Sequence, residues 1–252
     1  MAQGTYGKIR LFDDFLSVPT SGSNNHYTWG SAIAKIGSFG LFSVNEGSWA
    51  ATVDEPGGVV AITTDTADND NAAIVAGTFQ PADGTITMEA RFKIGHLTGA
   101  VFVGFTETLA SGTPVMPAEF ASATMTYNGS GGMVGFNYDS DGTTDDFRAI
   151  AADGGSATGN AETAGTRANQ TITADEWYVA KVEIYEDGKA AAWIAHDNDK
   201  GGFELVKRFD TAPVTPGDNF YATLMIENRD GNARVLEVDY IDVTAGRDWS
   251  ND

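Results

Sequence analysis

The sequence predicts an all-β protein with antiparallel strands, either a sandwich or a barrel, and three observations support this. Short runs rich in β-branched and aromatic residues recur along the 252 residues, separated by clusters of Gly, Asp, Asn and Pro. Several runs alternate apolar and polar residues with the period of two that a half-buried strand needs. No segment of a dozen residues carries the apolar stripe of a helix.

The first clear strands are predicted at residues 84–95 and 99–108. Apolar and polar side chains alternate strictly in the first, with Ile86, Met88, Ala90, Phe92 and Ile94 on one face and Thr87, Glu89, Arg91 and Lys93 on the other. Residues 99–108 are apolar almost throughout, which is typical of a central strand. Residues 117–125 are expected to hold one short helical turn at most.

A hairpin is predicted at residues 177–197, because two alternating runs flank Asp187-Gly188. This dipeptide suits a type I′ turn, whose two central residues both need positive φ. The segments 219–228 and 233–245 are predicted to pair with each other around the "RDGN" turn and to close the domain as a meander.

One domain is expected, because the chain shows no second hydrophobic core and 42% of its residues are hydrophobic. Residues 31–252 are assigned to a single β-sandwich domain, and residues 1–30 to an N-terminal arm or first strand that can contact a partner. Residues 150–172 are poor in large apolar side chains. They are either a partner-contacting arm or a plain surface loop.

The charge excludes some partners. Thirty-five acidic and fifteen basic residues give a formal net charge of −20, so a nucleic-acid partner is not expected. Solubility or a salty environment explains this charge, and a basic docking surface on a partner or bound cations explain it as well. No cysteine, signal peptide or membrane-spanning run is recognisable, so the protein is expected to be made in a cytoplasm, without a membrane partner.

The stretch "VLEVDYIDV", residues 235–243, places Glu237, Asp239 and Asp242 on one predicted strand. Retaining glycosidases use two carboxyl groups about 5–5.5 Å apart, and Glu237 and Asp239 share a face in a regular strand. Asp242 points with the apolar face unless a bulge reverses it. The stretch resembles the Glu-x-Asp-x-(x)-Glu strand of laminarinase-type glycoside hydrolases, but Ile241 or Asp242 stands where the second Glu belongs. It is more similar to the closing strand of that fold, so no catalytic residue is expected.

Acidic loops are candidates for calcium, although no cofactor is the leading expectation. Calcium takes six to eight oxygens, and the loop from Asp139 to Asp146 offers Asp139, Asp141, Asp145 and Asp146. The clusters at 65–71 and 196–202 are weaker. An EF-hand is excluded because Ile150 stands at position 12. Asp and Asn also form ordinary turns, and this is the favoured interpretation.

Histidine and tryptophan residues give no site. The three histidines, His26, His96 and His196, lack metal-ligand spacing and are expected on the surface or in loops. Trp177 and Trp193 are expected to pack in the core rather than to stack on a sugar; Trp29 and Trp49 are the other tryptophans that could in principle stack. Trp249, in a polar tail, is either a contact for a partner subunit or part of a disordered terminus. Catalytic, cofactor-binding and metal-binding residues are all expected to be absent.

Six blocks in order resemble virion proteins of tailed bacteriophages that carry a concanavalin A-like lectin/glucanase sandwich: residues 11–15, 86–94, 101–108, 133–151, 177–188 and 225–243. The resemblance implies a two-sheet antiparallel jelly roll and a non-enzymatic capsid decoration protein on the virion surface, assembled in a host bacterial cytoplasm. The implied partners are the major capsid protein and further copies of the chain, as a homotrimer or dimer. A carbohydrate-binding virion or tail component is the alternative, and a glycan-cleaving enzyme is a further rival.

Overall fold

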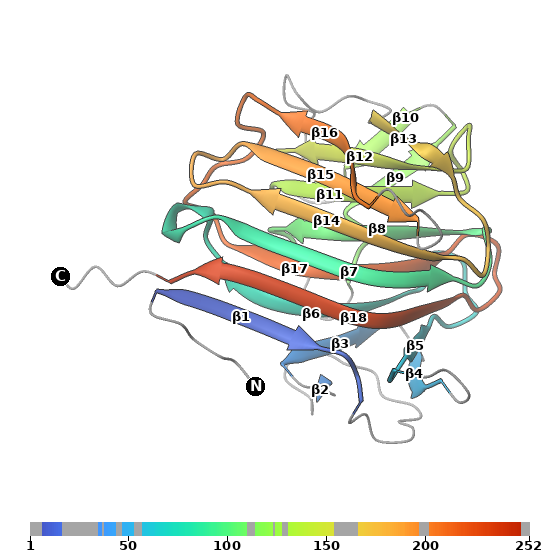
Figure 1. Cartoon of the computed structure of the whole chain (residues 1–252). Helices are drawn as coiled ribbons and strands as arrows, with labels where there is room; N and C mark the ends of the chain where they lie inside the picture. The colour runs from blue at the N-terminus through green and yellow to red at the C-terminus, as the bar shows by residue number, and fades with distance from the viewer. Residues whose placement is uncertain are drawn as a thin grey trace.

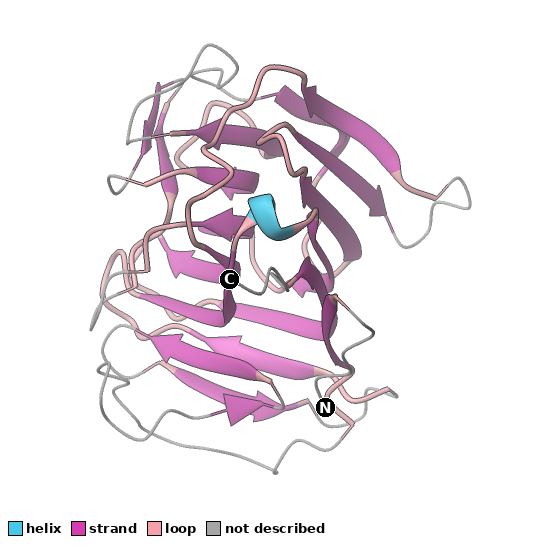
Figure 2. Cartoon of the chain, turned by 90° about the vertical axis from the view of Figure 1, so that its left-hand side faces the viewer, coloured by secondary structure: helices cyan, strands magenta, loops and turns pink. Residues whose placement is uncertain are grey.

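The computed structural model describes residues 7–16, 35–36, 38–43, 47–52, 57–109, 114–122, 124–127, 131–153, 166–196 and 202–247. These residues form two antiparallel sheets that pack face to face, as the two views at right angles show (Figures 1 and 2). The predicted two-sheet antiparallel β-sandwich is therefore confirmed. No helix among the described residues is long and apolar enough to cross a membrane.

The sheet in front in Figure 1 is named here the β7 sheet, after its central strand. Its strands follow the order β16 (Glu204–Phe209), β15 (Ala190–His196), β14 (Trp177–Ile184), β7 (Ile86–Ile94), β18 (Val235–Gly246), β5 (Val60–Thr63) and β4 (Ser48–Ala51). The long strand β18 pairs with β5 along its first part and with β1 (Lys8–Asp13) along its second. Part of the predicted N-terminal arm is thus a strand, while residues 1–6 and 17–34 lie outside the described residues.

The second sheet is named the β8 sheet. Its order is β13 (Thr166–Thr171), β12 (Asp146–Ala152), β11 (Met133–Asp139), β8 (Gly99–Thr106), β17 (Phe220–Asn228), β6 (Asn71–Phe79), β3 (Phe39–Ser43) and β2 (Lys35–Ile36). The apolar segment 99–106 is central and fully buried, as predicted. The predicted excursion at 150–172 begins and ends inside this sheet, in β12 and β13, and its residues 154–165 are outside the described part.

A separate hairpin of β9 (Ala118–Ala121) and β10 (Thr124–Tyr127) covers the outer face of the β8 sheet. At 117–125, where one short helical turn at most was expected, the described residues form strands instead. Met116, Ala118, Phe120 and Met125 are buried against apolar residues of the sheet, among them Phe102, Met133 and Met225. This alternation buries one face of a strand pair, which outweighs the local helical preference of an Ala-rich segment.

The core between the sheets forms because each strand turns its alternate apolar residues inward. The five apolar residues of β7 predicted to share a face are all buried. At the centre Phe147 packs edge-on against rings from both sheets, at centroid distances of 5.6 Å to Phe92, 5.7 Å to Tyr178, 6.0 Å to Tyr138 and 6.3 Å to Phe136. Edge-to-face geometry at these distances is favourable beyond the area buried.

The hairpin β14–β15 is confirmed, but its turn type is different from the prediction. Tyr185 and Lys189 pair through a backbone hydrogen bond, and the Gly188 N–H donates to the Tyr185 carbonyl. Gly188 has φ of 77°, whereas Asp187 is not among the residues with positive φ. The loop therefore has three residues, 186–188, and Gly188 supplies the single left-handed position of a type I turn with a bulge.

The predicted closing meander is wrong, because β17 and β18 lie in different sheets. β17 pairs with β6 and β8, and β18 pairs with β7. The "RDGN" turn crosses from one sheet to the other, with Gly231 at φ of 71°. A turn signal between two apolar strands marks a reversal of the chain and does not tell a hairpin from a crossover.

Glycine substitutions test the packing of the β14–β15 turn. A Cβ at Gly188 would lie 2.4 Å from the Val214 carbonyl oxygen, so Gly188→Ala is expected to lose more than about 2 kcal/mol of unfolding free energy. Gly202 is the matched control, since its φ is also positive but nothing lies within 4 Å; its Ala variant should lose only about 1 kcal/mol. Equal urea midpoints for the two variants would contradict the contact with Val214.

Candidate functional site

A groove of about 510 Å³ opens at the end of the sandwich where β14 turns into β15. It is lined by Thr85, Tyr185, Glu186, Asp187, Lys189, Arg208 and Asp210. Figure 2 looks onto this end, where the single helical turn η1 (Pro81–Asp83) lies. A neighbouring hollow of about 350 Å³ shares Thr85 and Glu186 and continues along Gly7, Lys8 and the last residues of β18. The groove thus joins one aromatic ring to side chains that donate and accept hydrogen bonds.

The groove residues are positioned by the hairpin turn. Lys189 Nζ lies 2.5 Å from Asp187 Oδ2, which holds two charged groups of the rim together. Burial raises the pKa of Tyr185, and the Glu183 carboxylate adds to the rise, so the phenol stays neutral at physiological pH. A neutral, half-buried tyrosine presents both a ring face and a hydroxyl to a ligand.

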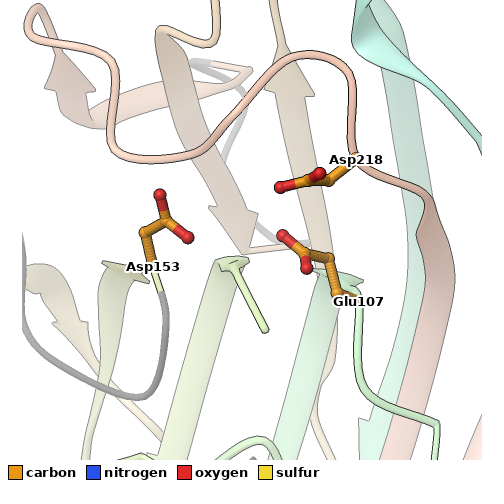
Figure 3. Close-up of side chains that lie close together, drawn as sticks. All are labelled: Glu107, Asp153 and Asp218. Atoms are coloured by element: carbon orange, nitrogen blue, oxygen red, sulfur yellow. The ribbon is translucent and has the colours of Figure 1, made fainter. Parts of the chain in front are cut away.

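An acidic cluster lies at the same end, on the other side of the loop 210–218. Glu107 follows β8, Asp153 follows β12 and Asp218 precedes β17, and their carboxylate oxygens lie within 4.8 Å of one another (Figure 3). Val214, buried in this loop, lies beside Gly188 of the hairpin turn and beside Gly132 before β11. One loop therefore borders both the groove and the cluster.

The cluster raises the pKa of one of its members. Burial raises the pKa of Glu107, a backbone hydrogen bond from Gly132 opposes this, and Asp218 and Asp153 add to the rise. A carboxyl group with a raised pKa beside other carboxylates can hold a proton or attract a cation. The sequence offers no local motif for this cluster. The three residues come together because β8, β12 and β17 belong to one sheet and bring these positions to the same end of it. That pairing is a property of the topology and is not visible in the local sequence.

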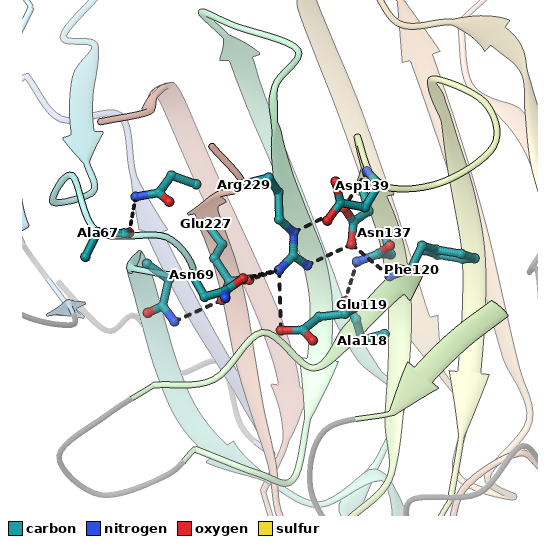
Figure 4. Close-up of polar contacts among 12 residues, drawn as sticks. Ala67, Asn69, Ala118, Glu119, Phe120, Asn137, Asp139, Glu227 and Arg229 are labelled. Atoms are coloured by element: carbon teal, nitrogen blue, oxygen red, sulfur yellow. Dashed lines mark hydrogen bonds and ion pairs between the residues drawn. The ribbon is translucent and has the colours of Figure 1, made fainter. Parts of the chain in front are cut away.

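A polar network at the opposite end centres on Arg229 (Figure 4). The Asp139 carboxylate accepts hydrogen bonds from Arg229 Nη2 (2.7 Å) and Nε (3.2 Å), and from the backbone N–H groups of Phe120 (2.8 Å) and Asp141 (3.0 Å). These four donors use the acceptor sites of the carboxylate. In the loop considered as a calcium candidate, Asp139 is therefore engaged by an internal guanidinium, and Asp141 and Asp145 are exposed. This geometry is that of a turn.

Glu227 is the buried acid of this network, with 2% of its surface exposed. Its Oε1 lies 2.6 Å from Arg229 Nη1, and Asn71 Nδ2 donates to its Oε2 at 3.3 Å. Burial raises the pKa of Glu227 to about 7, although Arg229 opposes the rise. Two buried asparagines hold the start of β9 and the segment before it, because Asn71 donates to the Pro114 carbonyl and Asn137 to the Ala118 carbonyl. Sequence reasoning saw only a turn here and missed Arg229 and Glu227.

The three carboxylates of β18 face outward, and each is paired with a base. The register of β18 against β7 shifts between Val238 and Tyr240, so a bulge at Asp239 is present and turns Asp242 outward. Lys93 lies 2.5 Å from Glu237, Arg91 lies 2.6 Å from Asp239, and Arg10 lies 2.7 Å from Asp242. None of the three lines the groove or the hollow beside it. Their geometry is that of a charged outer face.

The remaining candidates do not converge. His96 is exposed, and His196 contacts Glu176 and Tyr178. Core packing of Trp177 and Trp193 is a wrong prediction: both are half-buried on the outer face of the β7 sheet, beside Arg91 and Lys181 respectively. Trp49 is half-buried against the core. In the 65–71 cluster, Asp70 accepts the Ala67 N–H as in a turn. His26, Trp29, Trp249 and residues 197–201 lie outside the described residues.

The fold is similar to those of several solved structures. The chain is similar to a protein of unknown function from Shewanella oneidensis MR-1 (14% identity, TM-score 0.57, 97% of this chain and 89% of the other). It is also similar to peanut lectin (10%, 0.55, 94% and 97%) and to the carbohydrate recognition domain of Emp47p (12%, 0.56, 98% and 98%). The alginate lyase Aly36B aligns with a TM-score of 0.50 at 10% identity, over 93% of this chain and 96% of the other. No protein-family model and no curated protein matches the sequence.

These observations define the fold as a two-sheet antiparallel β-sandwich similar to that of concanavalin A-like lectins, the fold that the sequence resemblance implied. At 10–14% identity the likeness shows the fold alone. The same fold carries both lectins and a lyase, so the fold does not decide between binding and catalysis.

Neutralising one member of the acidic cluster should stabilise the protein. Asp218→Asn removes a negative charge beside Glu107 and is expected to raise the free energy of unfolding at pH 7 by a few tenths to about 1 kcal/mol, since the cluster is partly solvated. The pKa of Glu107, followed by carboxyl-carbon NMR, should fall at the same time. Asp210→Asn, in the same loop but outside the cluster, is the control and should leave that pKa unchanged.

The buried acid of the Arg229 network predicts a pH dependence. Because the pKa of Glu227 is raised to about 7 in the folded chain, its contribution to stability is full below its unfolded pKa and is lost as pH rises through about 7. Glu227→Gln should flatten the fall in stability between about pH 5 and about pH 8, by roughly 3 kcal/mol at most. Chemical denaturation at each pH measures this, and an unchanged profile would contradict the burial of an ionisable Glu227.

Proposed function

We propose that the protein binds a glycan in the groove beside Tyr185. The observation that carries this proposal is the combination of one aromatic ring with hydroxyl, carboxylate, ammonium and guanidinium groups in an open groove of about 510 Å³. Sugars are bound by stacking their C–H faces on an aromatic ring while side chains hydrogen-bond their hydroxyls. The volume falls within the range of about 300–1,000 Å³ of small-molecule sites. The likeness to peanut lectin and to a carbohydrate recognition domain supports the proposal at the level of fold.

The charge around the groove favours a neutral glycan over an anionic one. The groove has three acidic residues, Glu186, Asp187 and Asp210, against Lys189 and Arg208, and the acidic cluster lies across the adjacent loop. The chain as a whole carries −20. A polyuronate such as alginate would meet repulsion here, in spite of the fold shared with an alginate lyase.

Substitution of Tyr185 tests the groove. Tyr185→Ala should weaken binding of a neutral oligosaccharide, selected from a glycan array, by about tenfold or more, whereas Tyr185→Phe should keep most of the affinity because the ring remains. Tyr221→Ala, at a half-buried tyrosine away from the groove, is the control. Calorimetric titration gives the affinities. Retention of full affinity by Tyr185→Ala, or no binding to any glycan, would overturn the proposal.

The proposed function is glycan binding without catalysis. The alternative is that the protein cleaves the glycan, with the acidic cluster as the catalytic site. A carboxyl group with a raised pKa beside other carboxylates is an arrangement that glycoside hydrolases use. If hydrolysis of a bound glycan is detected and Glu107→Gln abolishes it, the protein is an enzyme acting through this cluster. If Glu237→Gln abolishes it, the β18 strand is catalytic after all.

No cofactor is proposed as a requirement. The acidic cluster offers three carboxylates where calcium takes six to eight oxygens, so calcium would need water and ligand oxygens to complete its shell. If the protein binds calcium, the acidic cluster is therefore a better candidate site than the Asp139–Asp146 loop. A rise in melting temperature with CaCl₂ that Asp218→Asn removes would support it, and glycan affinity unchanged by a chelator would count against a role in binding.

Virion decoration is the second proposal. Its support is the resemblance of six sequence blocks to phage virion proteins, together with a negative charge that would keep decorated particles apart. The partner would be the major capsid protein, and glycan binding would be compatible with a decoration, tail or fibre location. Co-sedimentation with expanded capsids that lack this protein tests it: saturable binding at a fixed number of copies per capsomer supports decoration, and no binding removes it.

A further inference from the structure

The outer face of the β7 sheet differs in charge from the rest of the chain. This face is defined here by the outward residues of β1, β18, β7 and β14 together with Trp193 and Leu205 (Figure 1). It carries five basic and five acidic residues: Lys8, Arg10, Arg91, Lys93 and Lys181, and Glu89, Glu183, Glu237, Asp239 and Asp242. Thirty of the 35 acidic and ten of the 15 basic residues therefore lie elsewhere. The formal charge of −20 belongs to the rest of the molecule, and this face is neutral.

The neutrality is local, because four of the five bases pair with carboxylates of this face, three of them across strands. Arg10, Arg91 and Lys93 contact the three carboxylates of β18, Lys181 lies 2.7 Å from Glu183, and Tyr240 donates its hydroxyl to Glu89 at 2.7 Å. Aromatic rings support these bases, with Trp177 beneath Arg91 at 4.3 Å and Trp193 beneath Lys181 at 5.1 Å. Paired, ring-supported charges lose less hydration on contact than isolated ones.

One row of residues crosses the face and ends in an exposed apolar side chain at both edges. The strand registers place Leu205, Trp193, Lys181, Glu89, Asp242 and Phe12 opposite one another in that order. Leu205 is 44% exposed and Phe12 is 43% exposed. When two such faces meet, the exposed apolar groups at their edges can be buried against each other, which is favourable.

We propose that two copies of this chain associate through this face, about a two-fold axis that runs along the strands at the centre of the row. Such an axis exchanges the two edges, so that Phe12 meets the partner's Leu205. At the centre Lys181 meets the partner's Glu89, which brings opposite charges together, and Trp193 meets the partner's Asp242. The face is thus self-complementary, as a two-fold interface requires. This inference is independent of glycan binding, and the groove lies at the end of the sandwich, beside the face.

The charge distribution favours association of two copies through this face over association through acidic surfaces. Copies with a charge of −20 repel each other wherever acidic surfaces meet, and close contact through the neutral face avoids this repulsion. Six strands about 4.8 Å apart, over the 6 residues of the edge strands β1 and β16 at about 3.3 Å per residue, give roughly 600 Å² per copy. A standard interface buries about 800 Å² per partner, so a reversible dimer of micromolar affinity is expected.

The dimer should have an unusual salt dependence. The long-range repulsion between the two negative molecules is screened by salt, whereas the contact itself is neutral. Raising NaCl from about 0.05 M to about 0.5 M should therefore tighten association, by at least about threefold in the dissociation constant. An interface held by ion pairs between an acidic and a basic surface would weaken instead.

Paired substitutions at the exposed edges test the axis by sedimentation equilibrium of the full chain. Leu205→Glu alone and Phe12→Lys alone should each weaken the dimer at least tenfold. The double variant should recover most of the affinity, because the two new charges face each other across the axis. Val115→Glu is the control: Val115 is 41% exposed, lies outside this face and gives the same change in charge as Leu205→Glu.

Two results would overturn the proposal. The first is a chain that remains monomeric at about 1 mM protein and about 0.5 M NaCl, a concentration far above the expected dissociation constant. The second is a dimer that Leu205→Glu and Phe12→Lys leave intact, or that Val115→Glu weakens equally, which would place the contact on another surface. A recovery in the double variant is the result that a role in monomer stability alone does not give, and circular dichroism of each variant confirms folding.

Discussion

The structure depends on one contact, the packing of Phe147 against four rings between the sheets. Phe92 and Tyr178 come from the β7 sheet and Tyr138 and Phe136 from the β8 sheet. The hydroxyl groups of the two tyrosines also bond to chain segments that connect the sheets. Tyr138 donates to the Leu97 carbonyl at 2.5 Å, and the Thr173 N–H donates to the Tyr178 hydroxyl at 2.8 Å. Each of these tyrosines fixes a crossing between the sheets as well as the spacing of the sheets. The strand ends, and with them the groove and both polar clusters, take their positions from this core.

Carboxylate groups are stabilised in different ways at the two ends of the sandwich. At the Arg229 end, one guanidinium faces Asp139, Glu227 and Glu119, and burial raises the pKa of Glu227 although Arg229 opposes the rise. At the groove end, the acids of the cluster stay partly solvated and Glu107 carries the rise. A buried base removes the need for a bound cation at the first end. The second end keeps its carboxylates accessible, which is the chemistry that a binding or catalytic site needs.

The strands and the fold class could be predicted from sequence because they depend on local patterns. The alternation in 86–94 and the Asp-Gly reversal at 187–188 require only short-range rules, and both were correct in position. The pairing of β17 with β18 was predicted wrongly, since nothing local tells whether two apolar strands separated by a turn share a sheet. Glu107, Asp153 and Asp218 were missed for the same reason: their proximity is a product of topology. The two outward tryptophans were misassigned because a ring that supports a cation has the same sequence signature as a ring in the core.

The bulge at Asp239 explains why the three carboxylates of residues 235–243 all face outward. Side chains alternate with a period of two, so without an extra residue Asp242 would face the core and Ile241 the solvent. The bulge restores both, placing Ile241 in the core and Asp242 opposite Phe12 and within reach of Arg10. The three carboxylates that resemble a catalytic motif therefore all point outward, where each pairs with a base on β7 or β1. That pairing makes the face neutral, and a neutral face is what a molecule of charge −20 needs in order to approach its own copy.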